Sequence, residues 1–324
     1  MHLIYYEHLE RRNGMQHYST CVRVAFVFAA FLLLSTGSVW AQTAPAASGS
    51  ATFTVTAVGK KAEAPPIGKD DVQLTQGKER KQILDWKKSD SLFLAILIDD
   101  SIDTGAGGQW DYLKEFIAAQ PASTQVAVGY IRNNVTMLAQ DFTPNHELAA
   151  KALRLPLGAS ALGSSPYLGM IDVLKRWPNT GPRRSILLIT SGIDYFRGSS
   201  FGLFYPDLDP LIQRAERQNT NVWTIYYPSA SHRGHSFYLV NTAQNNIDKL
   251  SQDTGAESYF LGVQSPVSIK PYLDEVTQHL NNQYLLTFAG DGGKKGKFVS
   301  VKVKTEMPGV EFFAPAAVFL PPAS

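Results

Sequence analysis

A long apolar stretch from residue 91 to residue 104 begins with large hydrophobic residues that do not alternate with polar ones. Such a run is typical of a strand that helices cover on both faces, as in the middle of a parallel sheet. It ends in oxygen-bearing side chains, including Asp99, Ser101 and Asp103. Ligands bind at the carboxyl ends of strands in open α/β sheets, and hard cations such as Mg²⁺ and Ca²⁺ prefer oxygen ligands. These three residues are therefore candidate metal ligands. The alternative is that Asp99 and Ser101 only cap the strand and the next helix.

Strand-like and helical patterns alternate from residue 89 to residue 263. Further strands are predicted at 125–132, 135–142, 184–192 and 221–227, and Asn133 with Asn134 suits a tight hairpin between the first two. Helices are predicted at 109–120, 146–155, 168–174, 207–218 and 239–250. This order predicts the α/β class: a doubly wound, mostly parallel sheet with helices on both faces.

The two flanks of this region have a different pattern. Half-buried strands are predicted at 51–58, 71–75 and 82–86, and a helix at 268–281 is followed by strands at 284–289, 297–305 and 310–319. The glycine-rich segment 290–293 predicts a hairpin. We expect the flanks to form one small antiparallel β appendage. The apolar tail that we expect to pack against it contains Phe312, Phe313, Val318, Phe319 and Leu320.

The N-terminus has the features of an export signal. An apolar core at 24–34 follows Arg23 and leads to a small-residue pattern that ends at Ala41. This core is shorter than the roughly 20 residues of a membrane span. We predict a signal peptide at 1–41, with the true start at Met15, and a linker at 42–50. The mature chain is then divided into a β segment at 51–88, an α/β domain at 89–263 and an extension at 264–324, with no membrane span.

Cysteine usage and charge narrow the class of protein. The only cysteine, Cys21, lies within the predicted signal, so the mature chain has none. Export without disulfides favours a bacterial envelope protein, either periplasmic or secreted. The formal net charge is +2, which gives no reason to expect a nucleic-acid partner.

Catalytic motifs are not complete in this sequence. His232 and His235 resemble half a zinc site, but no further His or Cys follows at ligand spacing, and a polar loop is the simpler interpretation. The segment 234–236 resembles the start of a nucleophile elbow, but Tyr238 stands where the closing Gly belongs. No glycine-rich phosphate loop follows a predicted strand. We therefore do not expect an enzyme.

An aromatic loop follows the predicted strand at 184–192. Exposed aromatic side chains at this edge of the sheet would form a protein-binding surface, and the alternative is that they fold back and cover the domain. The candidate partner-binding residues are Tyr195, Phe196, Phe201, Phe204 and Tyr205.

The order of elements resembles a von Willebrand factor A domain, and most closely the secreted bacterial branch labelled VWFA-related, acidobacterial type. The passages that carry the resemblance are 94–101, 67–72 with Gly77, 187–192, 250–255 and 283–286, which together span nearly all of the mature chain. The family's functional centre is a metal-ion-dependent adhesion site. It is built from Asp-x-Ser-x-Ser on the first strand, a Thr before a later helix and an Asp after the fourth strand.

The resemblance implies which residues hold the metal here. Asp99 and Ser101 match the first two positions, and Asp103 stands where the second Ser is usual. Ser165, or its neighbour Ser164, falls near the position of the Thr.

The last position of this site departs from the family. Ser191 stands where the family has an Asp, and Asp194 is near enough in sequence to contribute an oxygen instead. The resemblance implies Mg²⁺, Ca²⁺ or Mn²⁺ as the cation, with the last ligand supplied by an acidic residue of a partner protein. The loss of one carboxylate weakens such a site.

Two hypotheses follow from these observations. The first is a non-catalytic, adhesion-type module that binds a protein partner at the carboxyl edge of its sheet, through a cation at a degenerate adhesion site. The second is a structural or assembly protein whose metal site has decayed and whose β appendage and apolar tail make the contacts.

Overall fold

A six-stranded sheet forms the centre of the fold, with strands in the order β10-β9-β8-β5-β6-β7. The computed structural model describes residues 49–60, 64–158, 164–177, 183–196, 205–230, 237–259, 262 and 264–322. The strands are β5 (Leu92–Asp99), β6 (Thr124–Arg132), β7 (Val135–Thr143), β8 (Arg183–Thr190), β9 (Thr220–Tyr226) and β10 (Ser258–Tyr259). Every neighbouring pair is parallel except β6 and β7. The predicted signal peptide lies outside the described residues.

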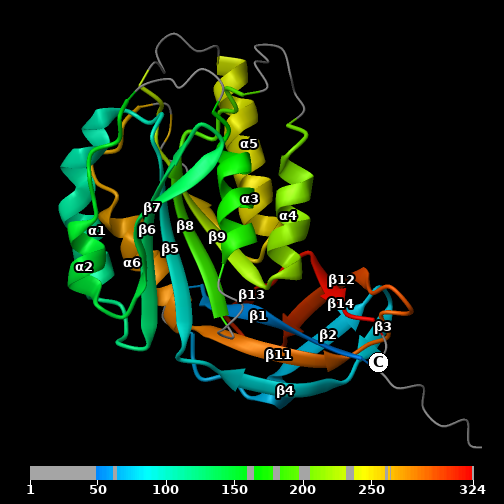
Figure 1. The fold of residues 1–324 in the computed structure, drawn as a ribbon. Coiled ribbons are helices and arrows are strands. Elements are labelled where there is room, and N and C mark those ends of the chain that lie inside the picture. The colour runs from blue at the N-terminus through cyan, green and yellow to red at the C-terminus, as the bar shows by residue number, and fades with distance from the viewer. Residues whose placement is uncertain are drawn as a thin grey trace, which may run out of the picture. The chain divides into compact units, whose positions relative to one another are not determined.

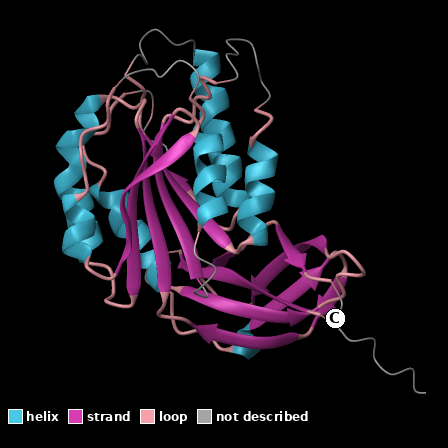
Figure 2. Cartoon of the chain, viewed as in Figure 1, coloured by secondary structure: helices cyan, strands magenta, loops and turns pink. Residues whose placement is uncertain are grey.

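Helices cover both faces of this sheet, as Figure 2 shows. On one face the core joins β5 and β6 to α1 (Trp110–Ala118), α2 (His146–Lys151) and α6 (Lys270–Asn281). On the other it joins β5 and β8 to α3 (Pro166–Arg176), α4 (Leu208–Arg217) and α5 (Phe237–Asp253). Every residue of β5 is buried, which accounts for its unbroken apolar sequence. The predicted α/β fold class is confirmed.

The β6–β7 hairpin is confirmed at the predicted position. Asn133 and Asn134 have φ values of 51° and 67°, and asparagine tolerates this left-handed region better than most residues. Helix α2 ends at Lys151, four residues before the predicted end. Pro156 explains the difference, because the residue before a proline avoids helical geometry.

The flanking segments form two small sheets packed face to face. One has the order β13-β1-β11-β4 and the other β14-β12-β2-β3. Their strands are β1 (Ser50–Gly59), β2 (Val72–Gln76), β3 (Glu79–Lys81), β4 (Ile83–Lys88), β11 (Gln283–Ala289), β12 (Lys297–Thr305), β13 (Val310–Phe313) and β14 (Ala317–Leu320). The described residues also include two 3₁₀ turns, η1 (Lys69–Asp71) and η2 (Thr104–Gln109). In Figure 1 these sheets lie at the end of the large sheet where β5 begins.

Two predictions about these sheets are wrong in detail. The segment 290–293 does not close a hairpin, because β11 and β12 belong to different sheets. Its glycines are needed for close approach instead: a Cβ on Gly292 would lie 1.9 Å from the carbonyl oxygen of Pro321. The predicted strand 310–319 is two strands, β13 and β14, and they pair with different partners on either side of Pro315.

The apolar tail packs in the sandwich in part: Phe312, Val318 and Leu320 join its core, whereas Phe313 packs against the core of the large sheet. Val318 and Leu320 are 3% and 1% exposed, and they belong to the same core as Phe53 and Phe288. Phe319 packs edge-on to Phe298 with ring centroids 5.2 Å apart.

Candidate functional site

Asp99 is the last residue of β5. It is buried, with an exposed fraction of 2%. Its Oδ1 accepts a hydrogen bond of 2.9 Å from the backbone N–H of Ser101, and its Oδ2 accepts one of 2.7 Å from the Oγ1 of Thr190. Burial raises the pKa of Asp99, and these hydrogen bonds oppose that rise. Among the described residues no basic side chain pairs with this carboxylate, so its charge has only neutral donors.

Thr190 was not identified from the sequence as part of this site. It is the last residue of β8, and the register pairs Ile98 with Ile189, so Thr190 stands beside Asp99. Its Oγ1 also accepts a hydrogen bond of 2.9 Å from the N–H of Gly192. Its position in the sequence could have identified it. Thr190 ends a second buried strand, and parallel strands place their carboxyl ends at the same edge of a sheet.

Ser165 is the N-cap of α3, and it links that helix to Asp194. Its Oγ accepts from the N–H of Leu168 at 3.4 Å and donates to Oδ2 of Asp194 at 3.0 Å. Its own N–H donates to Oδ1 of Asn134 at 2.8 Å. The alternative residue, Ser164, acts through its backbone: its carbonyl accepts from the N–H of Tyr195.

Tyr167 joins the two halves of the site. Its hydroxyl donates to the carbonyl of Gly192 at 2.8 Å. Burial raises its pKa well above the usual value, and the charges of Asp194 and Asp99 raise it further, so both carboxylates lie within electrostatic reach of this hydroxyl. The structure therefore gathers Asp99 and Asp194 at the edge where β5, β8 and α3 meet.

Two of the predicted metal ligands, Ser101 and Asp103, differ in their hydrogen bonding. The hydroxyl of Ser101 is buried and makes no hydrogen bond within the described part of the chain. Asp103 instead caps η2, with its Oδ1 accepting from the N–H of Gly105 at 2.7 Å. Ser191, which stands at the departing position, is fully buried, and its Oγ accepts from the N–H of Ile193 at 3.4 Å.

Asp100, the neighbour of Asp99, is already paired. Arg154 donates two hydrogen bonds of 2.7 Å to its two carboxylate oxygens. The guanidinium also lies 3.6 Å from the ring centroid of Tyr130. This bidentate geometry fixes the segment that follows α2 against the end of β5.

The predicted aromatic surface is only partly exposed. Phe196 is 45% exposed, and Tyr195 is partly buried. Tyr205 is 7% exposed and its ring packs on Tyr167 at 5.5 Å between centroids, so it covers the domain instead of presenting a surface. Phe201 and Phe204 lie outside the described residues, as do His232 and His235.

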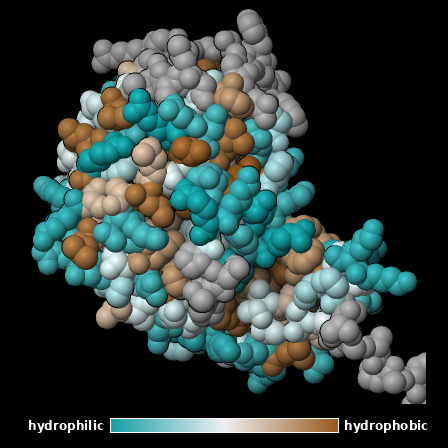
Figure 3. Space-filling model, viewed as in Figure 1, coloured by the Kyte–Doolittle hydropathy of each residue, from teal (hydrophilic) through white to brown (hydrophobic). Residues whose placement is uncertain are grey.

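Other exposed apolar side chains come from loops at the same edge of the large sheet. Val135 begins β7 just after β6 ends, and Phe237 begins α5 after β9. Val267 lies before α6, and its carbonyl accepts a hydrogen bond from Gln109, which follows β5. The exposed members of this set are Val135, Leu155, Leu157, Phe196, Phe237, Tyr238 and Val267. In the view of Figure 3, hydrophobic residues are interspersed with hydrophilic ones.

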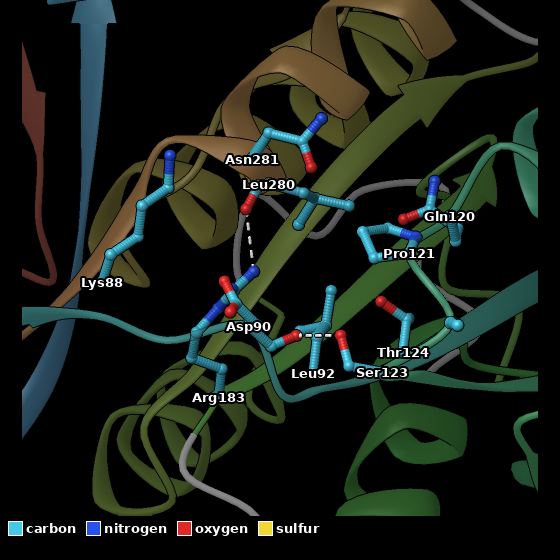
Figure 4. Close-up of a pocket in the computed structure, with 11 residues that line it drawn as sticks. Lys88, Asp90, Leu92, Gln120, Pro121, Ser123, Thr124, Arg183, Leu280 and Asn281 are labelled. Atoms are coloured by element: carbon cyan, nitrogen blue, oxygen red, sulfur yellow. Dashed lines mark hydrogen bonds between the residues drawn. The ribbon is translucent and has the colours of Figure 1, made fainter. Parts of the chain in front are cut away.

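A cavity of about 450 Å³ lies at the opposite end of the large sheet, where β5 and β8 begin. Figure 4 shows Arg183 reaching across it to the carbonyl of Leu280, at 2.8 Å. Arg183 also donates to the side chain of Gln283 and to the carbonyl of Ser89. Burial lowers its pKa to about 10. Because all three hydrogen bonds go to protein acceptors, this cation has a structural role: it ties β8 to α6 and β11.

Comparisons with known proteins found matches among solved structures alone. No protein-family model matches the sequence, and no curated protein matches it. Similar solved structures include an aerotolerance-related membrane protein from Bacteroides fragilis with multiple mutations to serines, at 10% identity and a TM-score of 0.44, covering 59% of this chain and 99% of that one. Similarity at this level carries nothing about binding or activity.

Von Willebrand factor A domains are among these structures. The VWA domain of SpRpn10 is 18% identical, with a TM-score of 0.39, and the match covers 58% of this chain and 95% of that one. A von Willebrand factor type A protein from Catenulispora acidiphila is 9% identical, with a TM-score of 0.38, covering 87% and 76%. In the described part of the chain, no helix has the length and apolar character needed to cross a membrane.

Proposed function

We propose that this chain is a non-catalytic, exported module that binds a protein partner at the edge of the large sheet where β5 and β8 end. A divalent cation, Mg²⁺, Mn²⁺ or Ca²⁺, is held there by Asp99, Ser101, Ser165 and Asp194. By the family resemblance, an acidic residue of the partner supplies a further ligand.

The observation that carries this proposal is the pair formed by Asp99 and Ser101. Within the described residues, no basic side chain pairs with the buried carboxylate, and the buried hydroxyl two residues later has no partner at hydrogen-bonding geometry. An unpartnered buried hydroxyl costs about 1–3 kcal/mol, and a buried carboxylate costs more unless a counter-charge is present. A bound cation would satisfy both groups at once.

The donor set fits a hard cation. All four proposed ligands offer oxygen, which is what Mg²⁺ and Ca²⁺ prefer. Asp194 supports the set, because its Oδ2 is hydrogen bonded to the hydroxyl of Ser165. It thereby offers a second carboxylate where Ser191 has replaced the family's Asp. Asp103 adds negative charge beyond Ser101.

The surroundings fit a protein partner. Exposed apolar side chains from five different segments, including Phe196, Phe237 and Val267, lie at the same edge. Apolar and aromatic side chains around a polar centre are the usual composition of a protein-binding surface.

The alternative, a structural protein that uses its β appendage and apolar tail, has less support. Val318 and Leu320 are buried in the core of the sandwich. The guanidinium of Arg217 covers Phe319 and lies 3.8 Å from the centroid of the Phe319 ring. These side chains therefore serve the fold of the chain itself.

Calorimetric titration of Mg²⁺, Mn²⁺ and Ca²⁺ into the purified chain tests the proposal. Saturable binding is expected, and it should be lost in Asp99→Asn, which keeps the shape of the side chain but not its charge. The matched control is Asp111→Asn, an exposed acid on α1. Absence of binding by all three cations, or binding that Asp99→Asn leaves intact, would contradict the cation part of the proposal.

A further inference from the structure

A second group of metal-binding side chains lies at the outer strand of the large sheet, away from Asp99. Glu257 immediately precedes β10, and Glu275 and His279 stand on α6. One potential ligand atom from each lies within 4.8 Å of the other two. Glu275 and His279 are four residues apart, so their side chains share one face of the helix. The loop before β10 brings in the third residue.

His279 is held in a fixed orientation. It is 5% exposed, and its ring stacks on Trp223 with centroids 5.1 Å apart and packs edge-on to Phe313 at 5.6 Å. Its Nδ1 is 3.2 Å from the hydroxyl of Tyr259. The other ring nitrogen makes no hydrogen bond within the described residues. A buried histidine oriented through one nitrogen, with the other one unused, has the arrangement of a metal ligand.

The two carboxylates have no counter-charge. Neither Glu257 nor Glu275 makes a side-chain hydrogen bond or ion pair among the described residues. Burial raises the pKa of Glu257, and the negative charges of Glu275 and Asp248 raise it further. Burial also raises the pKa of Tyr259, and the negative charges of Glu257 and Glu275 add to the rise. Negative charge thus converges here without a basic residue.

The protonation of the histidine agrees with this geometry. Burial lowers the pKa of His279 to about 4, so the ring is neutral at pH 7. Neutral imidazole is the form that binds a metal, and it does not offset the charge of the glutamates.

A cavity borders Glu257, one member of this cluster. It has a volume of about 370 Å³ and is bounded by Glu257, Asp248 and Ser258, with Phe312 and Phe313 on its apolar side. An ion and its remaining water ligands can therefore approach Glu257 without displacing the core.

We propose that Glu257, Glu275 and His279 bind a divalent transition-metal ion, with Zn²⁺ as the best fit, and that water completes the coordination. Imidazole with carboxylates suits Zn²⁺ and its transition-metal neighbours, whereas Mg²⁺ and Ca²⁺ favour sites made of oxygen alone. The ion fastens α6 to the loop before β10. This site goes beyond the proposed binding function and is independent of Asp99.

Zinc titration into the purified chain tests this site, with competition against a chromophoric chelator to measure affinity and stoichiometry. Glu275→Gln is the first variant, because Glu275 is exposed and its loss should not unfold the chain. Asp274→Asn is the matched control, since Asp274 is the exposed neighbour that pairs with Lys270. We expect the native chain to bind one zinc ion. The affinity for this ion should fall by about tenfold or more in Glu275→Gln and Glu257→Gln, and it should be unchanged in Asp274→Asn and Asp99→Asn.

Cobalt spectroscopy supplies a readout that does not depend on stability. Co²⁺ bound by the three residues should give visible d–d absorption, and this signal should disappear in His279→Gln if that variant keeps its circular dichroism spectrum. Zinc affinity equal in the native chain, Glu257→Gln and Glu275→Gln would overturn the proposal, because the ion would then be bound elsewhere. Absence of zinc binding by the native chain would overturn it as well, while leaving the Mg²⁺ result at Asp99 unaffected.

Discussion

The hydroxyl of Thr190 donates a 2.7 Å hydrogen bond to the carboxylate of Asp99 and so joins the ends of β8 and β5. The same oxygen accepts from the N–H of Gly192. Thr190 thus sets both the orientation of the proposed cation ligand and the path of the loop that leads to Asp194.

Thr190→Val should destabilise the chain by about 1–3 kcal/mol, because it leaves a buried carboxylate oxygen and a buried N–H each without a partner. Urea unfolding measures the change. Thr190→Ser is the control, since it keeps the hydroxyl and loses only a methyl group, worth about 1 kcal/mol. Equal losses in the two variants would show that packing, and not the hydrogen bond, is what Thr190 contributes.

Asp99→Asn should stabilise the metal-free chain and make it insensitive to Mg²⁺. Burial raises the pKa of Asp99, which means that the folded state resists the charged form; the amide removes that cost. An increase in Tm is expected without metal. The native chain should gain stability on addition of Mg²⁺, since a ligand of the folded state raises Tm. A variant that still responds to Mg²⁺ would place the cation elsewhere.

Gly169→Ala should weaken both stability and cation binding. A Cβ at this position of α3 would lie 2.4 Å from Cγ2 of Ile131 on β6, so the helix must move away from the sheet. Overpacking of this kind costs about 1–3 kcal/mol. Because Ser165 caps the same helix, its hydroxyl moves with it.

The control for this change is Gly108→Ala, where an added Cβ meets nothing within 4 Å. Thermal unfolding and Mg²⁺ titration of both variants make the comparison. If Gly169→Ala loses stability and retains full Mg²⁺ affinity, Ser165 is not a ligand.

Glu216 makes stability depend on pH between 4.5 and 7. Burial raises its folded-state pKa from 4.5 to about 7, although its Oε1 accepts a hydrogen bond from the N–H of Ala317 at 2.9 Å. The folded state therefore holds a proton that the unfolded chain releases. The contribution is fully present below pH 4.5 and is lost as the pH rises through 7.

Glu216→Gln should remove this part of the pH dependence, because the amide cannot ionise and its oxygen still accepts from Ala317. The measurement is Tm of both proteins from pH 4 to pH 8, with the exposed Glu115→Gln as control. The difference in Tm between Glu216→Gln and the native chain should grow as the pH rises. A constant difference would mean that Glu216 does not titrate in this range.

Part of the candidate site was predictable from local sequence. The apolar run of β5 ends in Asp99 and Ser101, and parallel strands place their carboxyl ends at one edge. The capping role of Asp103 was not predicted, because capping had been considered only for Asp99 and Ser101. The helical spacing of Glu275 and His279 was readable in principle, because it requires only one turn of helix. It was missed because the third member, Glu257, stands on a different element.

The remaining details depended on contacts between distant segments. The hydrogen bond from Ser165 to Asp194 spans residues 29 apart in sequence, and no spacing rule specifies it. The glycines at 290–293 have the composition of a hairpin, yet they cross between two sheets because β11 pairs with β1 and β12 pairs with β2. Strand pairing of this kind is decided by burial of the sandwich core, which no single segment contains.

The sequence by itself determined the class of fold, the buried central strand and the presence of oxygen-bearing side chains at its end, because hydrophobic period and strand direction are local properties. Only the tertiary structure decided which side chains meet. It buried Tyr205 against Tyr167, paired Asp100 with Arg154 and, within the described residues, left the hydroxyl of Ser101 without a partner at hydrogen-bonding geometry. The physical reason is that burial and hydrogen-bond partnership depend on the packing of elements far apart in the chain, and packing is a property of the whole fold.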